Sequence, residues 1–241
     1  MRYQFHMERN VVLAIGAHPD DMDFGASGSV ARFVEEGAKA YYLIATDGSK
    51  GSSDNSMTSE RLIKMRQDEQ REAGKILGLT DVFFLDHPDT ELVSDHTLKE
   101  EIVRLIRTLR PDTVITMNPT FFYFAGSEPG FVNHTDHRAI GLAVMDSVFP
   151  MARDRLTFPH HEAEGLEPWK VKELLFVNFT TPEYTIDISK TFDKKIEALR
   201  KHVSQFDDFD GVLQRITARA ENFGKDKGYK HAENFTRIVL P

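Results

Sequence analysis

The chain alternates short apolar runs with longer segments in which apolar residues recur at helical spacing. The apolar runs are rich in β-branched and aromatic residues and predict strands at residues 11–16, 40–45, 82–85, 113–117 and 174–179. The periodic segments predict helices at residues 30–34, 62–77, 98–109, 139–148 and 192–203. Such alternation is typical of βαβ units, so we predict an α/β fold with a mainly parallel sheet covered on both faces.

Glycine and proline residues at the ends of the predicted helices agree with that interpretation. Gly37 and Gly78 follow two predicted helices where a left-handed residue commonly ends a helix, and Pro111 and Pro150 follow two others. No internal repeat, low-complexity tract or Gly/Ser/Pro-rich linker interrupts the pattern, so residues 1–241 are predicted to form a single domain. The stretches 48–59 and 120–133 lack periodicity, follow predicted strands, and are expected to be functional loops.

Composition excludes several classes of site and partner. The chain has no Cys, so any bound metal must be held by His and carboxylate groups. Its 38 acidic and 30 basic residues give a net charge of −8, which disfavours binding to a phosphate backbone. The longest apolar run covers about seven residues, whereas a membrane span needs roughly 20. We expect a cytoplasmic protein with no membrane span and no nucleic-acid partner.

An imidazole and two carboxylates lie directly after the first predicted strand, in His18-Pro19-Asp20-Asp21. Pro19 has a fixed φ and pushes His18 toward extended geometry, so the chain turns sharply and the two carboxylates can point to different places. One carboxylate with His18 could hold a metal, while the other stays free to take a proton from metal-bound water. The alternative is an Asp-rich turn that caps the following helix.

A second polar cluster, Asn133-His134-Thr135-Asp136-His137, opens the predicted helix 139–148. His134 and His137 are three residues apart and can face the same way on a helix. One of them, with His18 and a carboxylate, would make a three-ligand shell with an open position, as in hydrolytic zinc sites. The alternative is a polar first turn in which Thr135 or Asp136 is the cap and the histidines are solvated.

Other motifs carry weaker signals. The segment 21–25 resembles the start of a calcium loop, but the third ligand position and the terminal Glu are missing. No glycine-rich phosphate loop and no G-x-S-x-G elbow occur in the chain. His160 and His161 lie near acidic residues and could recruit a metal, but their segment has no periodicity and is expected to be a solvated loop.

With these two clusters, His18-Pro19-Asp20-Asp21 and His134-x-Asp136-His137, the sequence resembles the PIG-L/LmbE family of zinc-dependent N-acetylglucosamine deacetylases. The resemblance covers about residues 10–206 and includes Thr46-Asp47-Gly48, Arg66, Asp89 and Lys201-His202-x-Ser204-Gln205. It implies a three-layer α/β/α Rossmann-like fold and one zinc ion per chain. It also implies a hydrolase that releases acetate from an N-acetylglucosamine-type amino sugar or conjugate.

The resemblance further implies a role for each site residue. The implied zinc ligands are His18, Asp21 and His137. Asp20 would be the general base, His134 would stabilise the oxyanion or act as acid, and Asp136 would orient His134. Arg66 and Asp89 would contact the sugar.

The sequence departs from the family pattern at Met22, where many members have an acidic residue, and at Val132, where some have Tyr. Without that Tyr, polarisation of the amide carbonyl falls to zinc and His134. Two other functions stay open. One is another zinc hydrolase, such as a phosphoesterase that uses Arg66 and Arg138, and the other is a sugar-binding module that has lost catalysis.

Four consecutive aromatic residues, 121–124, lie in the second long loop. They could form a platform for a sugar, or they could belong to the core or to a subunit interface. Four in a row cannot all be buried on one face of a strand, so some are expected to meet a ligand or another subunit. A homo-oligomer is therefore expected.

Overall fold

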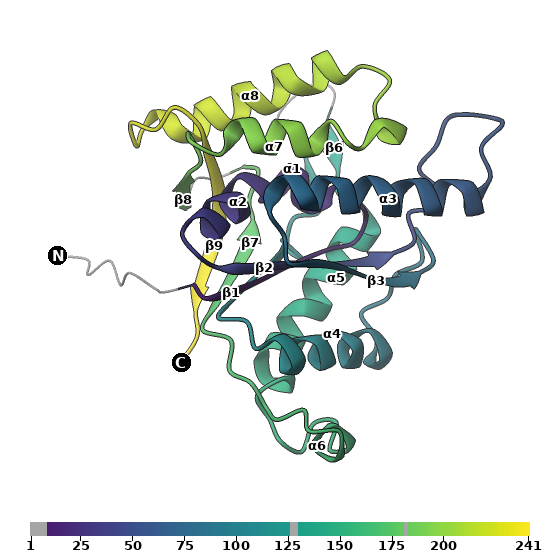
Figure 1. Cartoon of the computed structure of the whole chain (residues 1–241), viewed down its shortest axis with the longest axis vertical. Coiled ribbons are helices and arrows are strands. Elements are labelled where there is room, and N and C mark those ends of the chain that lie inside the picture. Colours follow the sequence, from purple (N-terminus) through teal and green to yellow (C-terminus); the bar gives the residue numbers. More distant parts are fainter. Residues whose placement is uncertain (1–8, 126–129, 181–182) are drawn as a thin grey trace.

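The computed structural model describes residues 9–125, 130–180 and 183–241. Its main sheet has seven strands in the order β3-β2-β1-β4-β7-β9-β8 (Figure 1). The strands are β1 (Val11–Gly16), β2 (Lys39–Thr46), β3 (Asp81–His87), β4 (Thr113–Met117), β7 (Glu173–Val177), β8 (Tyr184–Asp187) and β9 (Ala232–Val239). The first five named pair in parallel, whereas β9 is antiparallel to both β7 and β8. The predicted α/β fold with a mainly parallel sheet is confirmed.

Helices cover both faces of this sheet (Figure 1). One face carries α1 (Asp21–Gly25), α2 (Ser27–Glu35), α3 (Ser59–Leu77) and α7 (Phe192–Leu199), with α8 (Phe209–Lys225) beside α7. The other face carries α4 (His96–Leu109) and α5 (Thr135–Asp146), which is followed by the kinked segment η1 (Ser147–Met151), where Phe149 is extended. The short helices α6 (His160–Ala163) and η2 (Val203–Gln205) lie in connections. This is the three-layer arrangement that the resemblance implies.

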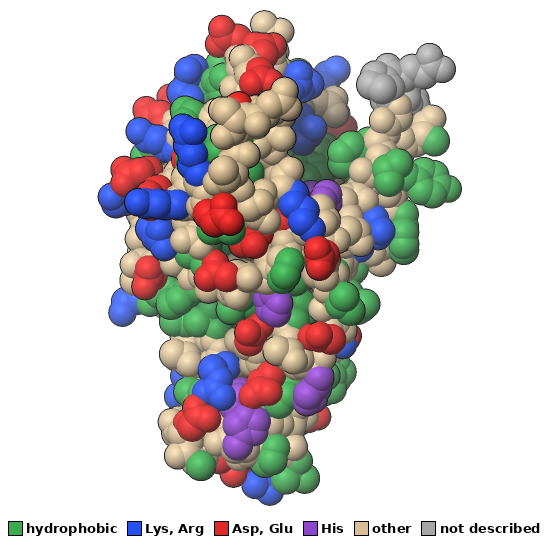
Figure 2. All heavy atoms as spheres, turned by 90° about the vertical axis from the view of Figure 1, so that its right-hand side faces the viewer, with side chains coloured by type: hydrophobic (Ala, Val, Ile, Leu, Met, Phe, Trp, Pro, Cys, Tyr) green, Lys and Arg blue, Asp and Glu red, His purple; other side chains and the backbone are tan. Residues whose placement is uncertain are grey.

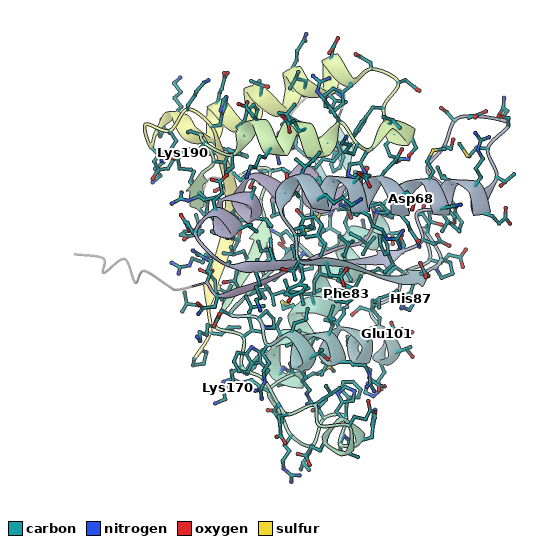
Figure 3. All side chains as sticks on the ribbon, in the orientation of Figure 1. Asp68, Phe83, His87, Glu101, Lys170 and Lys190 are labelled. Carbon is teal, nitrogen blue, oxygen red and sulfur yellow. The ribbon has the colours of Figure 1, made fainter. Side chains whose placement is uncertain are left out.

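The ends of the helices follow from local chemistry. The Thr58 side chain accepts a hydrogen bond from the Arg61 amide at the start of α3, and Gly78, with φ 77°, ends the same helix. Asp95 caps α4 in the same way through the Leu98 amide. Further along α4, Glu101 points toward His87 on the edge strand β3, with 2.6 Å between Nε2 and Oε2 (Figure 3).

The central strands are buried on both sides. Residues 12–15 of β1 and residues 113–116 of β4 are fully covered, as expected for parallel strands between two helical layers. From β1 the sheet extends through β2 to β3 on one side and through β4 to β7 on the other. The carboxyl ends of β1 and β4 therefore form the topological switch point, where open α/β sheets bind ligands.

Several elements differ from the sequence-based prediction. Helix α8 and strands β8 and β9 were not predicted, and the predicted helix 192–203 ends at Leu199. The stretch 120–133 contains a two-stranded hairpin of β5 (Tyr123–Phe124) and β6 (Phe131–Val132). Residues 126–129 of that stretch lie outside the described part of the chain.

Two observations bear on partners. Among the described residues, no helix combines the length and the apolar character that crossing a membrane requires. On the face shown in Figure 2, Lys and Arg side chains are interspersed with Asp and Glu side chains and do not form one continuous basic patch.

Candidate active site

The first motif forms the turn between β1 and α1. Asp20 has φ 102°, in the left-handed region that residues with a Cβ rarely adopt. Asp21 begins α1, and its Oδ2 accepts hydrogen bonds from the amides of Ala17 and His18, both at 2.9 Å. The Asp20 carboxylate instead lies 3.6 Å from Arg66 Nη2. The turn therefore sends the two neighbouring carboxylates to different partners, as predicted.

The second motif forms the start of α5. His137 Nδ1 lies 3.0 Å from Asn133 Oδ1, and Asn133 Nδ2 donates to the Phe121 carbonyl at 2.8 Å, which fixes the orientation of the amide. Because Asn133 Oδ1 only accepts, His137 Nδ1 donates to it, and Nε2 is the ring nitrogen that faces the site. That Nε2 lies 2.9 Å from Asp21 Oδ1. The two motifs, more than 100 residues apart in the sequence, thus meet in one site.

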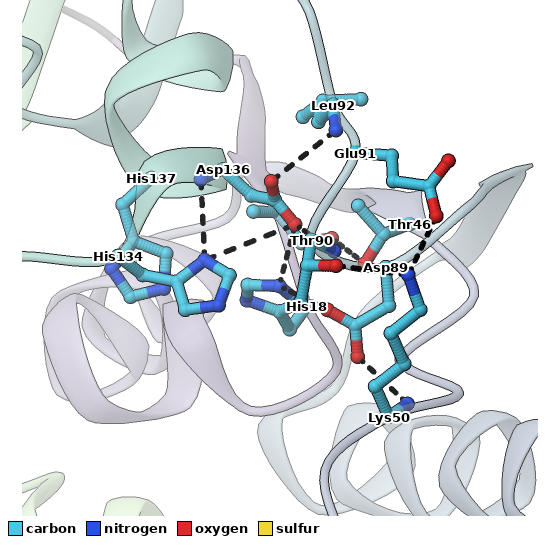
Figure 4. A network of polar contacts seen from close by, with 12 residues as sticks. His18, Thr46, Lys50, Asp89, Thr90, Glu91, Leu92, His134, Asp136 and His137 are labelled. Carbon is cyan, nitrogen blue, oxygen red and sulfur yellow. Dashed lines mark hydrogen bonds and ion pairs between the residues drawn. The ribbon is translucent and has the colours of Figure 1, made fainter.

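His18 lies at the centre of this site (Figure 4). Its Nε2 is 3.1 Å from Asp136 Oδ2 and 3.2 Å from Asp89 Oδ1, while its Nδ1 faces Asp21 Oδ2 at 3.6 Å. Burial opposes protonation of His18, but the hydrogen bonds to Asp136, Asp21 and Asp89 outweigh it and raise the pKa of His18 to about 12. The surrounding carboxylates therefore stabilise positive charge at this position.

The Asp136 side chain contacts His18, whereas its backbone amide contacts His134. Its fully buried carboxylate contacts the His18 ring and accepts hydrogen bonds from the amides of Thr90 at 2.7 Å and Leu92 at 3.3 Å (Figure 4). Its distance to His134 Nδ1 is 3.8 Å, too long for a hydrogen bond. The carboxylate thus orients His18, and the implied role of Asp136 toward His134 stays a prediction.

His134 is held by the backbone. The Asp136 amide donates to His134 Nδ1 at 3.2 Å, so the proton of the neutral ring is on Nε2. Burial and the positive charge of His18 lower the pKa of His134, which favours this neutral form. His134 is therefore a neutral hydrogen-bond donor at the edge of the site.

Asp20 has the environment of a general base. Burial raises its pKa to about 6, and the nearby Arg66 guanidinium opposes that shift. The backbone amide of Asp20 donates to Gln70 Oε1 at 2.9 Å. Within the described ranges, no hydrogen bond joins the Asp20 carboxylate to the imidazoles of His18, His134 or His137. The carboxylate is thus beside the cluster without being part of it.

Arg66 and Asp89 both lie at the site, and their contacts are with protein groups. Arg66 is 4% exposed and donates to the carbonyls of Pro19 at 2.7 Å and Gly48 at 3.0 Å. Asp89 accepts from the Lys50 amide at 3.0 Å and contacts His18. Burial raises the pKa of Asp89, but the contact with His18 outweighs it, and the pKa falls to about 2.

A buried hydrogen-bond network lies behind Asp20, and the sequence motifs did not predict it. His202 Nε2 lies 2.7 Å from Asp23 Oδ2, and Gln70 Nε2 donates to the same oxygen at 2.8 Å. Because Gln70 also accepts from the Asp20 amide, the network supports the strained turn at Asp20. The only signal in the sequence was the similarity around His202, since its partner Asp23 is 179 residues away.

The site opens into a cavity of about 1020 Å³. Asp21, Asn133 and His137 line it on the side of the motifs. Much of the remaining wall is aromatic: Phe24, Phe121, Phe124, Phe131, Phe176 and Phe179. Two of the four consecutive aromatics therefore line the cavity.

The donor groups fit a divalent metal. His18, His134 and His137 offer nitrogen atoms within 4.8 Å of one another, and His18 and His134 form a similar group with Asp89 and Asp136. Asp21 belongs to neither of these groups, but it contacts both His137 and His18. Imidazole and carboxylate are the donors of hydrolytic zinc sites, and the Asn133 hydrogen bond turns His137 Nε2 toward the site as such sites require.

A second group, Glu100, His160 and His161, also brings three donors together. Arg107 Nη1 donates to His161 Nδ1 at 3.3 Å, which places the proton of the neutral ring on Nε2. The Nε2 lone pair that a metal needs is therefore absent, so the first cluster is the better metal site.

Comparison with known proteins identifies close similarity in sequence and structure. The chain is 31% identical over 227 residues to the diacetylchitobiose deacetylase of Thermococcus kodakarensis, covering 92% of this chain and 80% of that protein. It is 28% identical to a probable N-acetyl-alpha-D-glucosaminyl L-malate deacetylase 2 of Bacillus anthracis, covering 81% of each chain. The N,N'-diacetylchitobiose deacetylase of Pyrococcus horikoshii superposes with a TM-score of 0.87 at 26% identity, covering 96% of this chain and 84% of that one.

The family model described as GlcNAc-PI de-N-acetylase matches residues 13–148, more than half of the chain. This range begins in β1 and ends just after α5, so it contains both motifs of the site. With this match and the 31% identical relative, the chain belongs to the PIG-L family.

Proposed function

We propose that this chain is a zinc-dependent hydrolase that removes the N-acetyl group from an N-acetylglucosamine-type amino sugar or conjugate and releases acetate. The observation that carries the proposal is the convergence of His18, Asp21 and His137, with the Asp20 carboxylate beside them and outside their hydrogen bonds. The relatives support it, because they are deacetylases of acetylated amino sugars. We further propose that residues 1–241 act as one catalytic domain.

One zinc ion per chain would be held by His18, Asp21 and His137. When bound, zinc supplies Lewis-acid chemistry, which activates water and polarises the acetyl carbonyl. The second nitrogens of both imidazoles are held by protein groups, His18 Nε2 by Asp136 and His137 Nδ1 by Asn133. Such hydrogen bonds orient metal-binding imidazoles.

The remaining groups would handle protons and developing charge. Asp20 accepts the proton that the attacking water loses, a contribution on the order of 10² to 10⁴ in rate. The Nε2–H group of His134 donates to the carbonyl oxygen as it gains negative charge. The proton taken up by Asp20 is then available to the departing amine. In this scheme His134 acts as a neutral donor, and Arg66 keeps Asp20 ionised.

Two variants separate the roles of the adjacent motif residues. Asp20→Asn is expected to retain zinc and lose most turnover, because it removes the base and leaves the ligands in place. His137→Ala is expected to lose the zinc itself. Zinc content by atomic absorption and acetate release, measured on the same samples, check both expectations. Equal loss of zinc from the two variants would contradict this division of roles.

The reaction itself is tested with N-acetylglucosamine, its chitobiose dimer and glycoside conjugates, with and without a chelator. Acetate release that chelation abolishes and zinc restores supports the proposal. Hydrolysis of a phosphomonoester instead, or sugar binding without turnover, would favour one of the two rival functions. The cytoplasmic location and the homo-oligomer expected from the sequence stay predictions, which fractionation and analytical ultracentrifugation would test.

A further inference from the structure

The peptide group between Pro19 and Asp20 is held at both ends by side chains of α3. The Pro19 carbonyl accepts a hydrogen bond from Arg66 Nη2 at 2.7 Å, and the Asp20 amide donates to Gln70 Oε1 at 2.9 Å. Arg66 and Gln70 are four residues apart on the helix, so they lie on the same face, and both side chains are buried. One turn of α3 thus fixes the plane of a single peptide group in the first motif.

This attachment opposes backbone strain at Asp20. With φ 102° and ψ −28°, Asp20 is in a region that residues with a Cβ rarely adopt. Such a conformation persists only where the surrounding structure holds it. A relaxed turn with negative φ would rotate the Pro19–Asp20 peptide away from α3 and change the direction of the Asp20 side chain. The hydrogen bond to Gln70 therefore helps to determine where the Asp20 carboxylate points.

The amide group of Gln70 is itself fixed on both sides. Its Oε1 accepts from the Asp20 amide, and its Nε2 donates to Asp23 Oδ2 at 2.8 Å. Because a backbone amide only donates and a carboxylate accepts, these two contacts determine which way the Gln70 amide is turned. Gln70, Asp23 and His202 have exposed fractions of 0%. Gln70 is therefore shielded from solvent and from any substrate in the cavity.

His202 supplies the partner that the buried Asp23 carboxylate needs. Its Nε2 lies 2.7 Å from Asp23 Oδ2, the same oxygen that Gln70 contacts. Burial opposes protonation of His202, but the hydrogen bond to Asp23 outweighs it and raises the pKa of His202. A buried carboxylate that is paired and hydrogen-bonded stays in place. Asp23 is thus a firm acceptor for Gln70, on the side of Gln70 that faces away from Asp20.

We propose that Gln70 is a positioning residue for the general base. Through its hydrogen bond to the Asp20 amide, it keeps the turn in its left-handed conformation and so aims the Asp20 carboxylate at the attacking water. This inference rests on the proposed deacetylase function and adds a residue to its machinery. Gln70 takes no part in proton transfer and touches no substrate. Its removal should therefore lower kcat and leave KM and the zinc content almost unchanged.

The test compares Gln70→Met with Gln67→Met in the zinc-loaded protein, with the chitobiose dimer as substrate. Met has a similar volume to Gln but makes neither hydrogen bond, so Gln70→Met is expected to lower kcat about ten- to hundredfold, the cost of a small misplacement of a reacting group. Gln67 is the matched control, because it lies on the same helix and its Nε2 donates to Asp86 Oδ1 at 2.8 Å in an exposed contact. Gln67→Met is expected to keep the wild-type kcat and KM.

A double-mutant cycle separates positioning of the base from a general structural effect. Asn in Asp20→Asn keeps the backbone amide and tolerates the left-handed region, but it cannot accept the proton. In that protein, adding Gln70→Met is expected to change the residual rate, followed with a radiolabelled acetyl group, by no more than about twofold. A wild-type kcat in Gln70→Met, or an equal loss in the two backgrounds, would overturn the proposal.

Hydrogen exchange tests the same contact without turnover. The Asp20 amide is expected to exchange about tenfold faster or more in Gln70→Met than in the wild type, and at the wild-type rate in Gln67→Met. Unchanged exchange in Gln70→Met contradicts the proposed attachment. Should Gln70→Met fail to fold, His202→Gln keeps an N–H donor toward Asp23 and should show smaller changes in the same directions, whereas wild-type kcat and exchange there count against the proposal. A wild type that binds zinc and releases no acetate refutes the deacetylase function itself, which is a different outcome from an active wild type whose Gln70 variant is equally active.

Discussion

Burial and the charge of Arg66 shift the pKa of Asp20 in opposite directions. This balance explains how a carboxylate beside a metal site can act as a base near neutral pH. Burial raises its pKa to about 6, and the Arg66 guanidinium limits the rise. A base must be ionised to accept a proton, so activity is lost as the pH falls through that value. Arg66 is itself fixed by the carbonyls of Pro19 and Gly48, so its charge stays in place beside Asp20.

Removing the charge of Arg66 should therefore shift the acidic limb of the pH–rate profile. In Arg66→Gln the pKa of Asp20 is expected to rise, moving the limb of kcat/KM to higher pH by about one to three units. Arg66→Lys keeps the positive charge and should leave the limb near pH 6. Profiles measured for the three proteins at equal zinc content check this. An unshifted limb in Arg66→Gln would show that another group controls it.

For individual site residues, the sequence predicted the structure correctly where the interacting residues are neighbours in the chain. His18, Asp20 and Asp21 are contiguous, and a strand followed by X-Pro predicts their turn without any tertiary knowledge. That Asp136 contacts His18 was not predictable. The contact depends on how the end of β1 and the start of α5 come together in the fold. The same holds for the pair of Asp23 with His202.

Among the elements, β9 shows most clearly why part of the fold was missed. Its sequence contains the polar residues Glu233 and Asn234, which do not suggest a buried strand. Both are nevertheless buried in the sheet. Glu233 accepts hydrogen bonds from the amides of Gly28 and Ser29 in the first turn of α2 and pairs with Lys195 of α7 at 2.6 Å. Only the tertiary partners make this strand possible, and a sequence pattern contains no sign of them.

Breaking the buried ion pair between Lys195 and Glu233 should destabilise the folded chain. Lys195 and Glu233 side chains are 3% and 6% exposed, and Lys195 also donates to the carbonyls of Asp23 and Phe24. Lys195→Met leaves Glu233 buried without its counter-charge and is expected to lower the free energy of unfolding by about 3–5 kcal/mol. Urea denaturation followed by circular dichroism measures the change.

Lys194, which precedes Lys195 in the chain, provides the control for this variant. Lys194 pairs with Glu35 at 2.8 Å, but the two side chains are 42% and 44% exposed. Lys194→Met is therefore expected to change the free energy of unfolding by only about 0–1 kcal/mol, because solvent screens the pair. A similar loss in both variants would mean that α7 is sensitive to any change of charge, and that the contact with β9 has no special role.

For the whole molecule, the order of the strands explains why two motifs from distant parts of the chain form one site. Since β1 and β4 are neighbours and parallel, the segments that follow them leave the sheet at the same edge. The first brings His18 and Asp21, and the second leads through the hairpin to His137. Prediction of strands and helices located both motifs at strand ends, but the adjacency of β1 and β4 depends on the topology, which periodicity alone does not determine.

A metal that joins these segments should stabilise the folded chain as a whole. The ligand set does not exist in the unfolded chain, so zinc bound at about a hundred times its Kd contributes about 2.7 kcal/mol. For a chain of this size, chelation is then expected to lower Tm by about 5–10 °C. In calorimetry, Asp20→Asn should show the same drop as the wild type, since its ligands are intact, whereas His137→Ala should melt at one temperature with or without chelator. A metal-dependent shift that survives in His137→Ala would place the ion elsewhere, and would separate the site of stabilisation from the residues assigned to catalysis.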